Sequence, residues 1–370
     1  MSSDAVVTPE WVNDPSTIHV RLGHRPARIG MDTEFIRERT YWPQLALVQI
    51  AYLDPAGVLR VLLIDPLPAG MADALAPILA DTGILKIMHS PSEDLVALRH
   101  TCGEVPRPVF DTQAAAALAG IGAGVGYQKL VEQLTGIALE KGETRSDWLR
   151  RPLSAAQLEY AADDVRHLFD MTDALDGLLA PLGRRAWVDE DAARTVLQAQ
   201  GDTSERWPHM SLRSAQFIDR AAQLRLLRLL RWRERQARSG DRPKTWVLDN
   251  ELAVAIARQA PSSAQALETM LDAHPKAPRK LASAIFEALH VPLDDESDAP
   301  DAARGEARDK QRLRKLQDIV AARAAELAIP DGTLASRRWL EALLDDGEWP
   351  AALSGWRRQI LEVEFTAALQ

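Results

Sequence analysis

The sequence predicts an α/β domain with a mixed sheet, followed by all-helical regions. Three closely spaced apolar runs between residues 28 and 64 have the Val, Ile and Leu content of strands. Beyond them, strand-like and helix-like segments alternate as far as about Pro181, and the rest of the chain is helical in pattern. Three strands followed by alternating strands and helices favour a mixed sheet that helices cover.

Each predicted strand is an apolar run bounded by turn-forming residues, as at Asp54-Pro55 and Asp65-Pro66. The predicted strands are Ile18–Leu22, Arg28–Phe35, Leu45–Leu53, Val58–Ile64 and Ile84–Met88. The predicted helices are Met71–Ala80, Ser92–Thr101, Asp111–Ala119, Tyr127–Leu134 and Trp187–Gln200. A further helix is predicted to begin after Ser154.

The composition is that of an ordinary globular protein, with 46% hydrophobic and 26% charged residues. A chain of 370 residues is too long for one typical core, so two or three domains are expected. The single cysteine, Cys102, excludes an internal disulfide and a cysteine-based zinc site, so we expect a reducing, cytoplasmic compartment. We recognise neither a signal peptide nor an apolar run near the ~18 residues of a membrane span.

Asp32 and Glu34 are the centre of the predicted site. They lie two apart in a predicted strand, and side chains two apart on a strand point to the same face. Buried carboxylates ~4 Å apart repel by ~4 kcal/mol at an effective dielectric near 20, and a divalent cation between them removes this cost. The alternative is an edge strand whose acids lie in water, and the spacing alone does not exclude it.

Ser90-Pro91-Ser92, followed by Glu93 and Asp94, is typical of a helix start with a serine cap and acids in the first turn. Asp94 is then either a carboxylate that the helix dipole favours or a further ligand. His89 ends the preceding strand, where a lone histidine is more often structural than catalytic.

Glycines alternate with small residues at Gly120, Gly122, Gly124 and Gly126. The pattern matches neither G-x-G-x-x-G nor a P-loop, so it predicts a flexible loop and not a nucleotide cradle. G-x-S-x-G and H-E-x-x-H do not occur, which excludes the simplest serine hydrolases and zinc proteases.

The most informative predicted helix begins at Ser154, which can form a capping box with Gln157. Its apolar face runs through Leu158, Ala161, Val165, Leu168 and Phe169. Tyr160 and Asp164 are four residues apart, so the hydroxyl and the carboxylate are directed at one point at the border of that face. Asp163 is also within reach of Tyr160, and this geometry prefers Asp164 only modestly. A surface tyrosine and aspartate are the alternative reading.

Four acids could gather at one end of the sheet beside Tyr160. They are Asp32, Glu34, Asp94 and Asp164. Without counter-charge, their convergence would cost several kcal/mol. The cluster therefore predicts two bound divalent cations, and oxygen ligands favour Mg²⁺ or Mn²⁺. Two such ions ~3.5–4 Å apart are common machinery for hydrolysing a phosphodiester.

Three motifs resemble those of the DEDD exonuclease superfamily, in its tyrosine-bearing branch. They are Asp32-Thr33-Glu34-Phe35, His89 followed by Asp94-Leu95, and Tyr160-Ala161-Ala162-Asp163-Asp164. Phe110-Asp111-Thr112 and Ser146-Asp147-Trp148-Leu149-Arg150-Arg151-Pro152-Leu153 are similar to the ribonuclease D family. The resemblance is close over roughly the first half of the chain. It implies a ribonuclease H-like fold for this half and selects Asp164 over Asp163 as the ligand.

The resemblance also implies roles for single residues. The implied ligands of the two metal ions are Asp32, Glu34, Asp94 and Asp164. Tyr160 would orient or help to deprotonate the attacking water, a contribution typically worth 10²–10⁴-fold. Hydrolysis would run 3′→5′ and release nucleoside 5′-monophosphates. His89 would support the scissile nucleotide, and Lys141 would help to stabilise phosphate charge.

One segment is strongly cationic, although the net charge of the chain is −9. Between Arg206 and Lys244, eleven Arg or Lys residues and three acids leave a net charge of +8. Four arginines with no matching acids are predicted to share one side of a helix: Arg225, Arg228, Arg231 and Arg235. A solvated charged face is the alternative, and contact with RNA phosphates is the better explanation.

The helical segments after Leu212 resemble the HRDC domain, a small domain that RecQ-type helicases share with ribonuclease D. Two such domains are expected, the second mainly by family expectation. The predicted domains are an exonuclease domain at 1–205, a first HRDC domain at 206–291, an acidic linker at 292–310 and a second HRDC-like domain at 311–370.

The predicted function is a metal-dependent 3′–5′ exoribonuclease that trims the 3′ ends of precursor tRNA and other small structured RNAs. RNA is the expected partner, no membrane contact is expected, and the default state is a monomer. One alternative is a single-strand DNA exonuclease, since nothing in the motifs senses a 2′-hydroxyl. The other is an inactive RNA-binding module, against which the complete set of acids argues.

Overall fold

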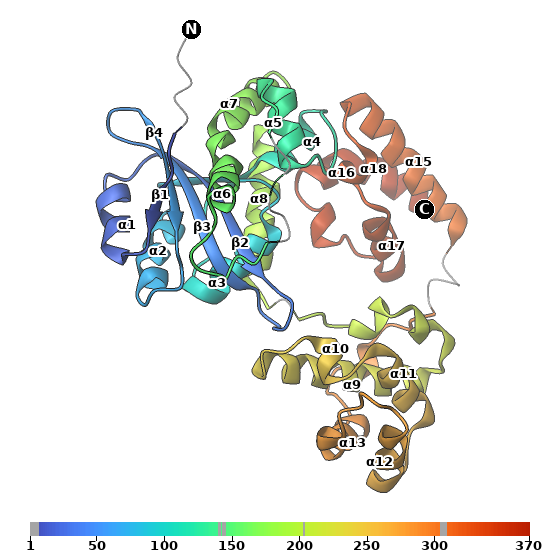
Figure 1. Ribbon diagram of the computed structural model, residues 1–370. Coiled ribbons are helices and arrows are strands. Elements are labelled where there is room, and N and C mark those ends of the chain that lie inside the picture. Colours follow the sequence, from blue (N-terminus) through green and yellow to red (C-terminus); the bar gives the residue numbers. More distant parts are fainter. Residues whose placement is uncertain (1–6, 140–141, 143–145, 203, 304–308) are drawn as a thin grey trace. The chain divides into compact units, whose positions relative to one another are not determined.

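The computed structural model describes residues 7–139, 142, 146–202, 204–303 and 309–370 (Figure 1). The chain divides into two compact units. The first comprises Met1–Ile36, Pro43–Asp202 and Lys310–Gln370, and the second comprises Arg37–Trp42 and Thr203–Asp309. The C-terminal helices therefore belong to the same unit as the sheet. Within the described ranges, no helix is long and apolar enough to cross a membrane.

The first unit is built on a mixed, six-stranded sheet in the order β1-β4-β3-β2-β5-β6. The strands are β1 (Glu10–Val12), β2 (Arg28–Ile36), β3 (Gln44–Leu53), β4 (Leu59–Ile64), β5 (Leu85–Met88) and β6 (Val109–Asp111). β2 and β4 run antiparallel to β3, whereas the β1–β4, β2–β5 and β5–β6 pairs are parallel. This confirms the predicted mixed sheet, and β1 and β6 are strands that the sequence pattern missed.

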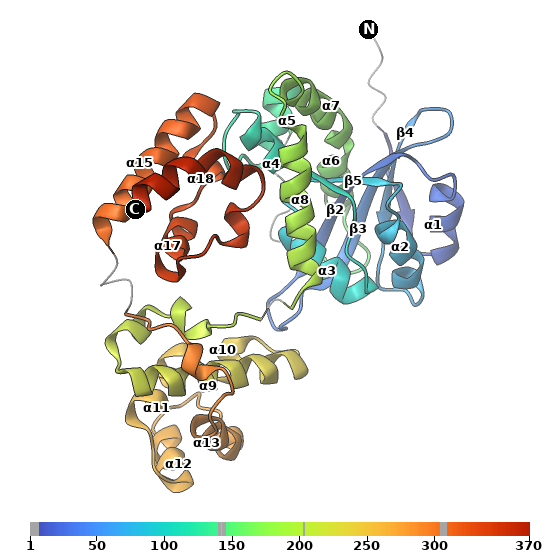
Figure 2. The same cartoon turned by 180° about the vertical axis from the view of Figure 1, so that it is seen from behind.

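Helices cover both faces of this sheet. They are α1 (Pro15–Leu22), α2 (Met71–Ala80), α3 (Ser92–Cys102), α4 (Thr112–Leu118), α5 (Tyr127–Thr135), α6 (Ala155–Arg166), α7 (Leu168–Leu179) and α8 (Arg185–Gln200). Side chains alternate along β3, so that Leu47 and Ala51 join the core under α6 and α7 while Val48 and Ile50 join the core with α1, α2 and α3. Figure 1 shows α6 in front of the sheet, and Figure 2 shows α2 and α3 on the other face.

The predicted strand Ile18–Leu22 is wrong, because these residues form most of helix α1. Asp14 caps this helix by accepting a hydrogen bond from the Ser16 amide at 2.9 Å, and Pro15 occupies its first turn. Ile18 and Leu22, four residues apart, are both buried. The start signal and the helical spacing outweigh the strand-like composition of this short run.

The C-terminal helices share the core of the first unit. They are α15 (Lys310–Leu327), α16 (Asp331–Leu334), α17 (Arg337–Asp346) and α18 (Trp356–Leu369), with a short 3₁₀ helix at Ala351–Leu353. Leu316 and Phe365 are fully buried in the same cluster as Leu175 of α7. The Trp187 and Trp356 rings stack at 4.4 Å, and the buried Arg184 donates to the carbonyl oxygens of Leu118 and Leu327.

The second unit is helical. It contains α9 (Arg220–Ser239), α10 (Lys244–Val247), α11 (Asn250–Gln259), α12 (Ala264–Asp272) and α13 (Ala282–His290), with 3₁₀ helices at Pro208–Ser211, Arg213–Phe217, Arg279–Leu281 and Glu296–Asp298. α9 forms the centre of its core, where Leu226, Leu229 and Leu230 are buried against α11 and α13. Asp219 caps α9 by accepting a hydrogen bond from the Ala222 amide at 2.8 Å.

Candidate active site

Asp32 and Glu34 lie on the face of β2 that α6 covers. Their cross-strand partners on β3 are Gln49 and Leu47, and Leu47 belongs to the core under α6. Met31, one residue before Asp32, belongs to the opposite core, as strand alternation requires. The structure therefore supports the predicted shared face and places it under a helix, not at an exposed sheet edge.

Asp94 lies in the first turn of α3, as predicted, but no serine caps this helix. The cap position is Pro91 and makes no side-chain hydrogen bond. Ser90 has a left-handed backbone conformation (φ 55°), and its amide donates to Asp111 Oδ1 at 3.0 Å. The serine-cap prediction is therefore wrong, because Ser90 is used to close the turn onto β6. Asp94 itself is buried, and its Oδ1 accepts a hydrogen bond from the Thr33 hydroxyl at 2.5 Å.

Helix α6 begins with the predicted capping box, in which Ser154 and Gln157 bond each other's backbone amides. One turn later Tyr160 and Asp164 lie close enough for each to shift the pKa of the other. Asp163 is used differently, because its carboxylate pairs with Arg166. The structure thus distinguishes Asp163 from Asp164, which the sequence spacing made almost equally good candidates to face Tyr160.

Burial and like charge raise the pKa of each of the four acids. Desolvation is the largest cause at every one of them. The charges of Asp94, Asp164 and Glu34 raise the pKa of Asp32 further, and those of Asp164 and Asp94 help to raise the pKa of Glu34 to about 8. Because Coulomb repulsion decays with distance, these effects indicate that the carboxyl groups of Asp94, Asp164 and Glu34 lie near that of Asp32.

These carboxyl groups fit a divalent-cation site in their chemistry. They are hard oxygen donors, and neither Glu34 nor Asp164 has a cationic partner among the described residues. Within the described ranges, however, no group of three or more His, Cys, Asp and Glu side chains is arranged to hold one ion as it stands. Rotation of the side chains would have to complete such a site, and metal ligation by the four acids stays a prediction.

Tyr160 is enclosed by residues that the sequence gave no reason to assign to the site. The Trp148 ring lies 6.0 Å from the Tyr160 ring and comes from the S-D-W-L motif. On another side, a Cβ added to Gly142 would lie 1.9 Å from Cδ2 of Tyr160, so only glycine fits there. Burial and the neighbouring carboxylates raise the pKa of Tyr160 above its ordinary value, so its phenol stays protonated at neutral pH.

His89 lies directly after β5 and not within it as predicted, and its neighbours hold it in place. Its Nδ1 lies 2.8 Å from the Thr112 hydroxyl, and its ring meets the Tyr127 ring edge-on at 5.7 Å. Burial lowers the pKa of His89 to about 4, so the imidazole is neutral at physiological pH. Lys141, the predicted phosphate contact of this half, lies outside the described residues.

The predicted arginine row is on α9, but the expectation that it has no matching acids is wrong. Glu296 accepts two 2.6 Å hydrogen bonds from Arg228, and Asp295 pairs with Arg231 at 2.6 Å. Both acids come from the segment predicted to be a linker, so local charge counting could not reveal the pairing. Arg225 donates to the carbonyl oxygen of Ala257 at 2.7 Å.

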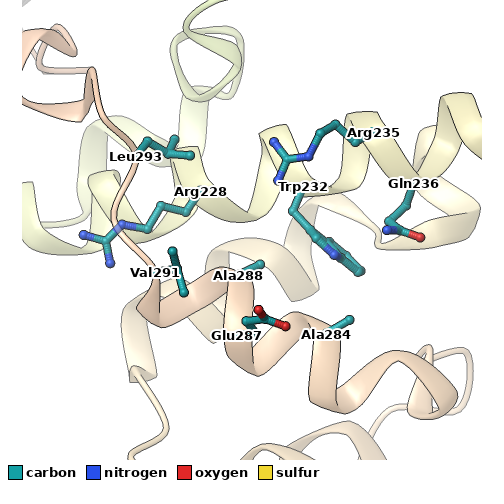
Figure 3. Close-up of a pocket in the computed structure, with 9 residues that line it drawn as sticks. All are labelled: Arg228, Trp232, Arg235, Gln236, Ala284, Glu287, Ala288, Val291 and Leu293. Carbon is teal, nitrogen blue, oxygen red and sulfur yellow. The ribbon is translucent and has the colours of Figure 1, made fainter.

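Arg235 differs from these three arginines. Among the described residues it has no hydrogen-bond or ion-pair partner, and it lines a pocket of about 360 Å³. Figure 3 shows this pocket between α9, which carries Trp232 and Arg235, and α13, which carries Ala284, Glu287 and Ala288. The pocket therefore combines an available guanidinium group with an indole ring and one carboxylate.

The chain is similar to known proteins over nearly its full length. Residues 14–180 match the family model described as 3′-5′ exonuclease, and residues 223–289 match that of the HRDC domain. The chain is similar to ribonuclease D of Xanthomonas oryzae pv. oryzae, with 56% identity over 98% of this chain and 99% of that protein. Ribonuclease D of Pseudomonas paraeruginosa is 35% identical over 99% of both. The crystal structure of Escherichia coli RNase D, an exoribonuclease involved in structured RNA processing, has a TM-score of 0.82 and 27% identity over 98% of both chains.

Proposed function

This chain belongs to the ribonuclease D family and is a 3′–5′ exoribonuclease. We propose that it trims the 3′ ends of precursor tRNAs and other small structured RNAs. Its products would be nucleoside 5′-monophosphates. The observation that carries the proposal is the group of Asp32, Glu34, Asp94 and Asp164 beside Tyr160. Asp94 is buried and the other three are half-buried, and desolvation together with neighbouring negative charge raises the pKa of each acid. Among the described residues, neither Glu34 nor Asp164 has a cationic partner that would compete with a divalent ion.

The four acids would hold two divalent ions, Mg²⁺ or Mn²⁺. When bound, such ions supply Lewis acidity at the phosphate and lower the pKa of water. Oxygen donors and their negative charge support this assignment. The Thr33 hydroxyl on Asp94 would hold one ligand in place from outside the site. His89, which is neutral, would contact the terminal nucleotide by hydrogen bonding or stacking and not by charge.

Digestion of matched RNA and DNA oligomers tests the proposed substrate. We expect stepwise shortening of RNA from its 3′ end, faster than that of DNA, and complete loss of hydrolysis with EDTA. Faster cleavage of DNA would favour the single-strand DNA exonuclease. Asp32→Ala should abolish hydrolysis and leave RNA binding measurable, whereas an inert wild type with Mg²⁺ and with Mn²⁺ would favour the inactive binding module.

Tyr160 would orient the attacking water through its hydroxyl group. The raised pKa of Tyr160, which desolvation and the nearby carboxylates cause, supports a protonated phenol over a phenolate base. Tyr160→Phe removes this oxygen and keeps the ring beside Trp148, so kcat should fall at least tenfold, and roughly 10²-fold if the oxygen acts in the transition state. Single-turnover kinetics measure the effect, with Mn²⁺ affinity as the control. An unaltered rate would remove Tyr160 from the mechanism.

The second unit would hold RNA, with Arg235 as its phosphate contact. The absence of a protein partner for Arg235, among the residues that the structure describes, supports this role. Arg235→Ala should weaken RNA binding and lower the slope of log affinity against log salt by about 1. Arg228→Ala is the matched control, because Glu296 already neutralises Arg228. Equal salt slopes for wild type and Arg235→Ala would show that Arg235 is a solvent-exposed side chain that does not contact phosphate.

The remaining assignments are also proposals. We propose a domain division at 1–205, 206–291, 292–310 and 311–370, with the last segment a second HRDC-like domain. The helices α15, α16, α17 and α18 support a helical character for this last segment. The protein would act as a monomer in the cytoplasm. The single Cys102 agrees with a reducing compartment.

A further inference from the structure

Gln49 is a buried polar residue directly beside the acids. It lies in β3 opposite Asp32 of β2, in the same register that pairs Leu47 with Glu34. Its side chain is 0% exposed, and neither Nε2 nor Oε1 has a hydrogen-bond partner in the part of the chain that the structure describes. Buried carboxamides almost always satisfy at least one of these atoms, so this exception requires a physical reason.

Strand alternation directs Gln49 to the face of Asp32. Leu47 and Ala51, the residues two before and two after it, both belong to the core under α6. Directly opposed residues of antiparallel strands have Cβ atoms about 4.5–5.5 Å apart. A glutamine side chain can therefore reach the carboxylate of its cross-strand neighbour without any change in the backbone.

Asp32 lacks what Gln49 can provide. No side chain among the described residues donates a hydrogen bond to the Asp32 carboxylate. Asp94, by contrast, accepts a hydrogen bond from the Thr33 hydroxyl. One acid thus has a neutral side-chain donor, and the other lies opposite a neutral donor that is not in use.

We propose that Gln49 is a positioning residue for Asp32: its carboxamide nitrogen donates to the Asp32 carboxylate when that group turns to bind a divalent cation. The inference rests on the proposed function of Asp32 as a metal ligand. Gln49 itself touches neither the ion nor RNA. A donor without charge suits this place, because a lysine or arginine would neutralise the carboxylate and compete with the cation.

The proposal predicts opposite effects on stability and on metal affinity. Gln49→Met keeps a similar side-chain volume and removes both unpaired polar atoms. The metal-free full-length variant should therefore unfold at the same temperature as wild type or higher. Its Mn²⁺ affinity should fall about 10- to 100-fold, the usual loss for a residue that orients a metal ligand.

The experiment measures Mn²⁺ binding by electron paramagnetic resonance and thermal unfolding on the full chain. Leu47→Met is the matched control, since it places the same side chain opposite Glu34. A Mn²⁺ affinity loss confined to Gln49→Met supports the proposal, and Gln49→Leu should repeat it. Equal Mn²⁺ affinities in Gln49→Met and Leu47→Met would overturn it and leave Gln49 as a packing residue.

Asp32→Asn separates this proposal from the one on which it rests. If Asp32→Asn binds Mn²⁺ as wild type does, the proposed metal site is wrong and the role of Gln49 fails with it. If Asp32→Asn loses Mn²⁺ binding while Gln49→Met keeps it, only the role of Gln49 fails. Loss in both variants supports both proposals.

Discussion

Asp164→Asn should lower kcat on an RNA oligomer by at least roughly 10³-fold, because it removes one charge of the group that would hold the divalent ions, and electrostatic stabilisation is usually the largest catalytic contribution. The substitution keeps the shape of the side chain and its hydrogen-bonding capacity toward Tyr160. Binding of RNA should persist, since the second unit would supply phosphate contacts.

Asp163→Asn is the matched control for this substitution. Asp163 is adjacent in sequence and on the same helix, yet its carboxylate pairs with Arg166 and is 31% exposed. Its loss removes a partly exposed ion pair, which is worth at most about 1 kcal/mol, and should leave kcat within a few-fold of wild type. Single-turnover rates for both variants decide the matter. Equal losses in the two would contradict the assignment of Asp164 as the ligand.

The sequence predicted those parts of the fold in which local signals and packing agree. Strand β3 is one apolar run with a turn at each end, and it is buried along nearly its whole length. Helix α6 carries both its own start signal, at Ser154, and the i, i+4 pair that faces the acids. The spacing of Asp32 and Glu34 was sufficient to predict their common face, because strand alternation is a local property.

What the sequence could not predict depends on contacts between distant segments. The Thr33 hydroxyl reaches Asp94 across 61 residues, and Arg228 reaches Glu296 across 68. The second contact reverses a conclusion drawn from local charge. Short segments fail for another reason. Ile18–Leu22 has strand-like composition, and the helix start signal that decides its structure lies upstream, at Asp14 and Pro15.

The C-terminal helices also join the first unit through contacts between distant segments. A substitution of Arg357 in α18 tests this most directly. Its side chain is 5% exposed, it donates to both carboxylate oxygens of Asp191 in α8, and it donates twice to the Thr333 carbonyl oxygen. Its guanidinium group also lies 4.2 Å from the centre of the Trp356 ring. Arg357→Ala leaves Asp191 with Arg194 as its remaining ion-pair partner.

Breaking a buried pair by removing one partner typically costs 3–5 kcal/mol, so Arg357→Ala should lower the free energy of unfolding by about 3 kcal/mol, and Tm by roughly 5–10 °C.

The adjacent Arg358 is the control, because its pair with Glu362 is 47% exposed on both sides. Arg358→Ala should lower the free energy of unfolding by about 0.5 kcal/mol or less. Thermal unfolding followed by tryptophan fluorescence measures both, since the stacked Trp187 and Trp356 rings lie at this junction. Similar losses of unfolding free energy in the two variants would mean that α18 does not depend on the Arg357–Asp191 pair. A loss confined to Arg357→Ala, with a parallel loss of exonuclease activity at 37 °C, would show that the C-terminal helices stabilise the catalytic unit.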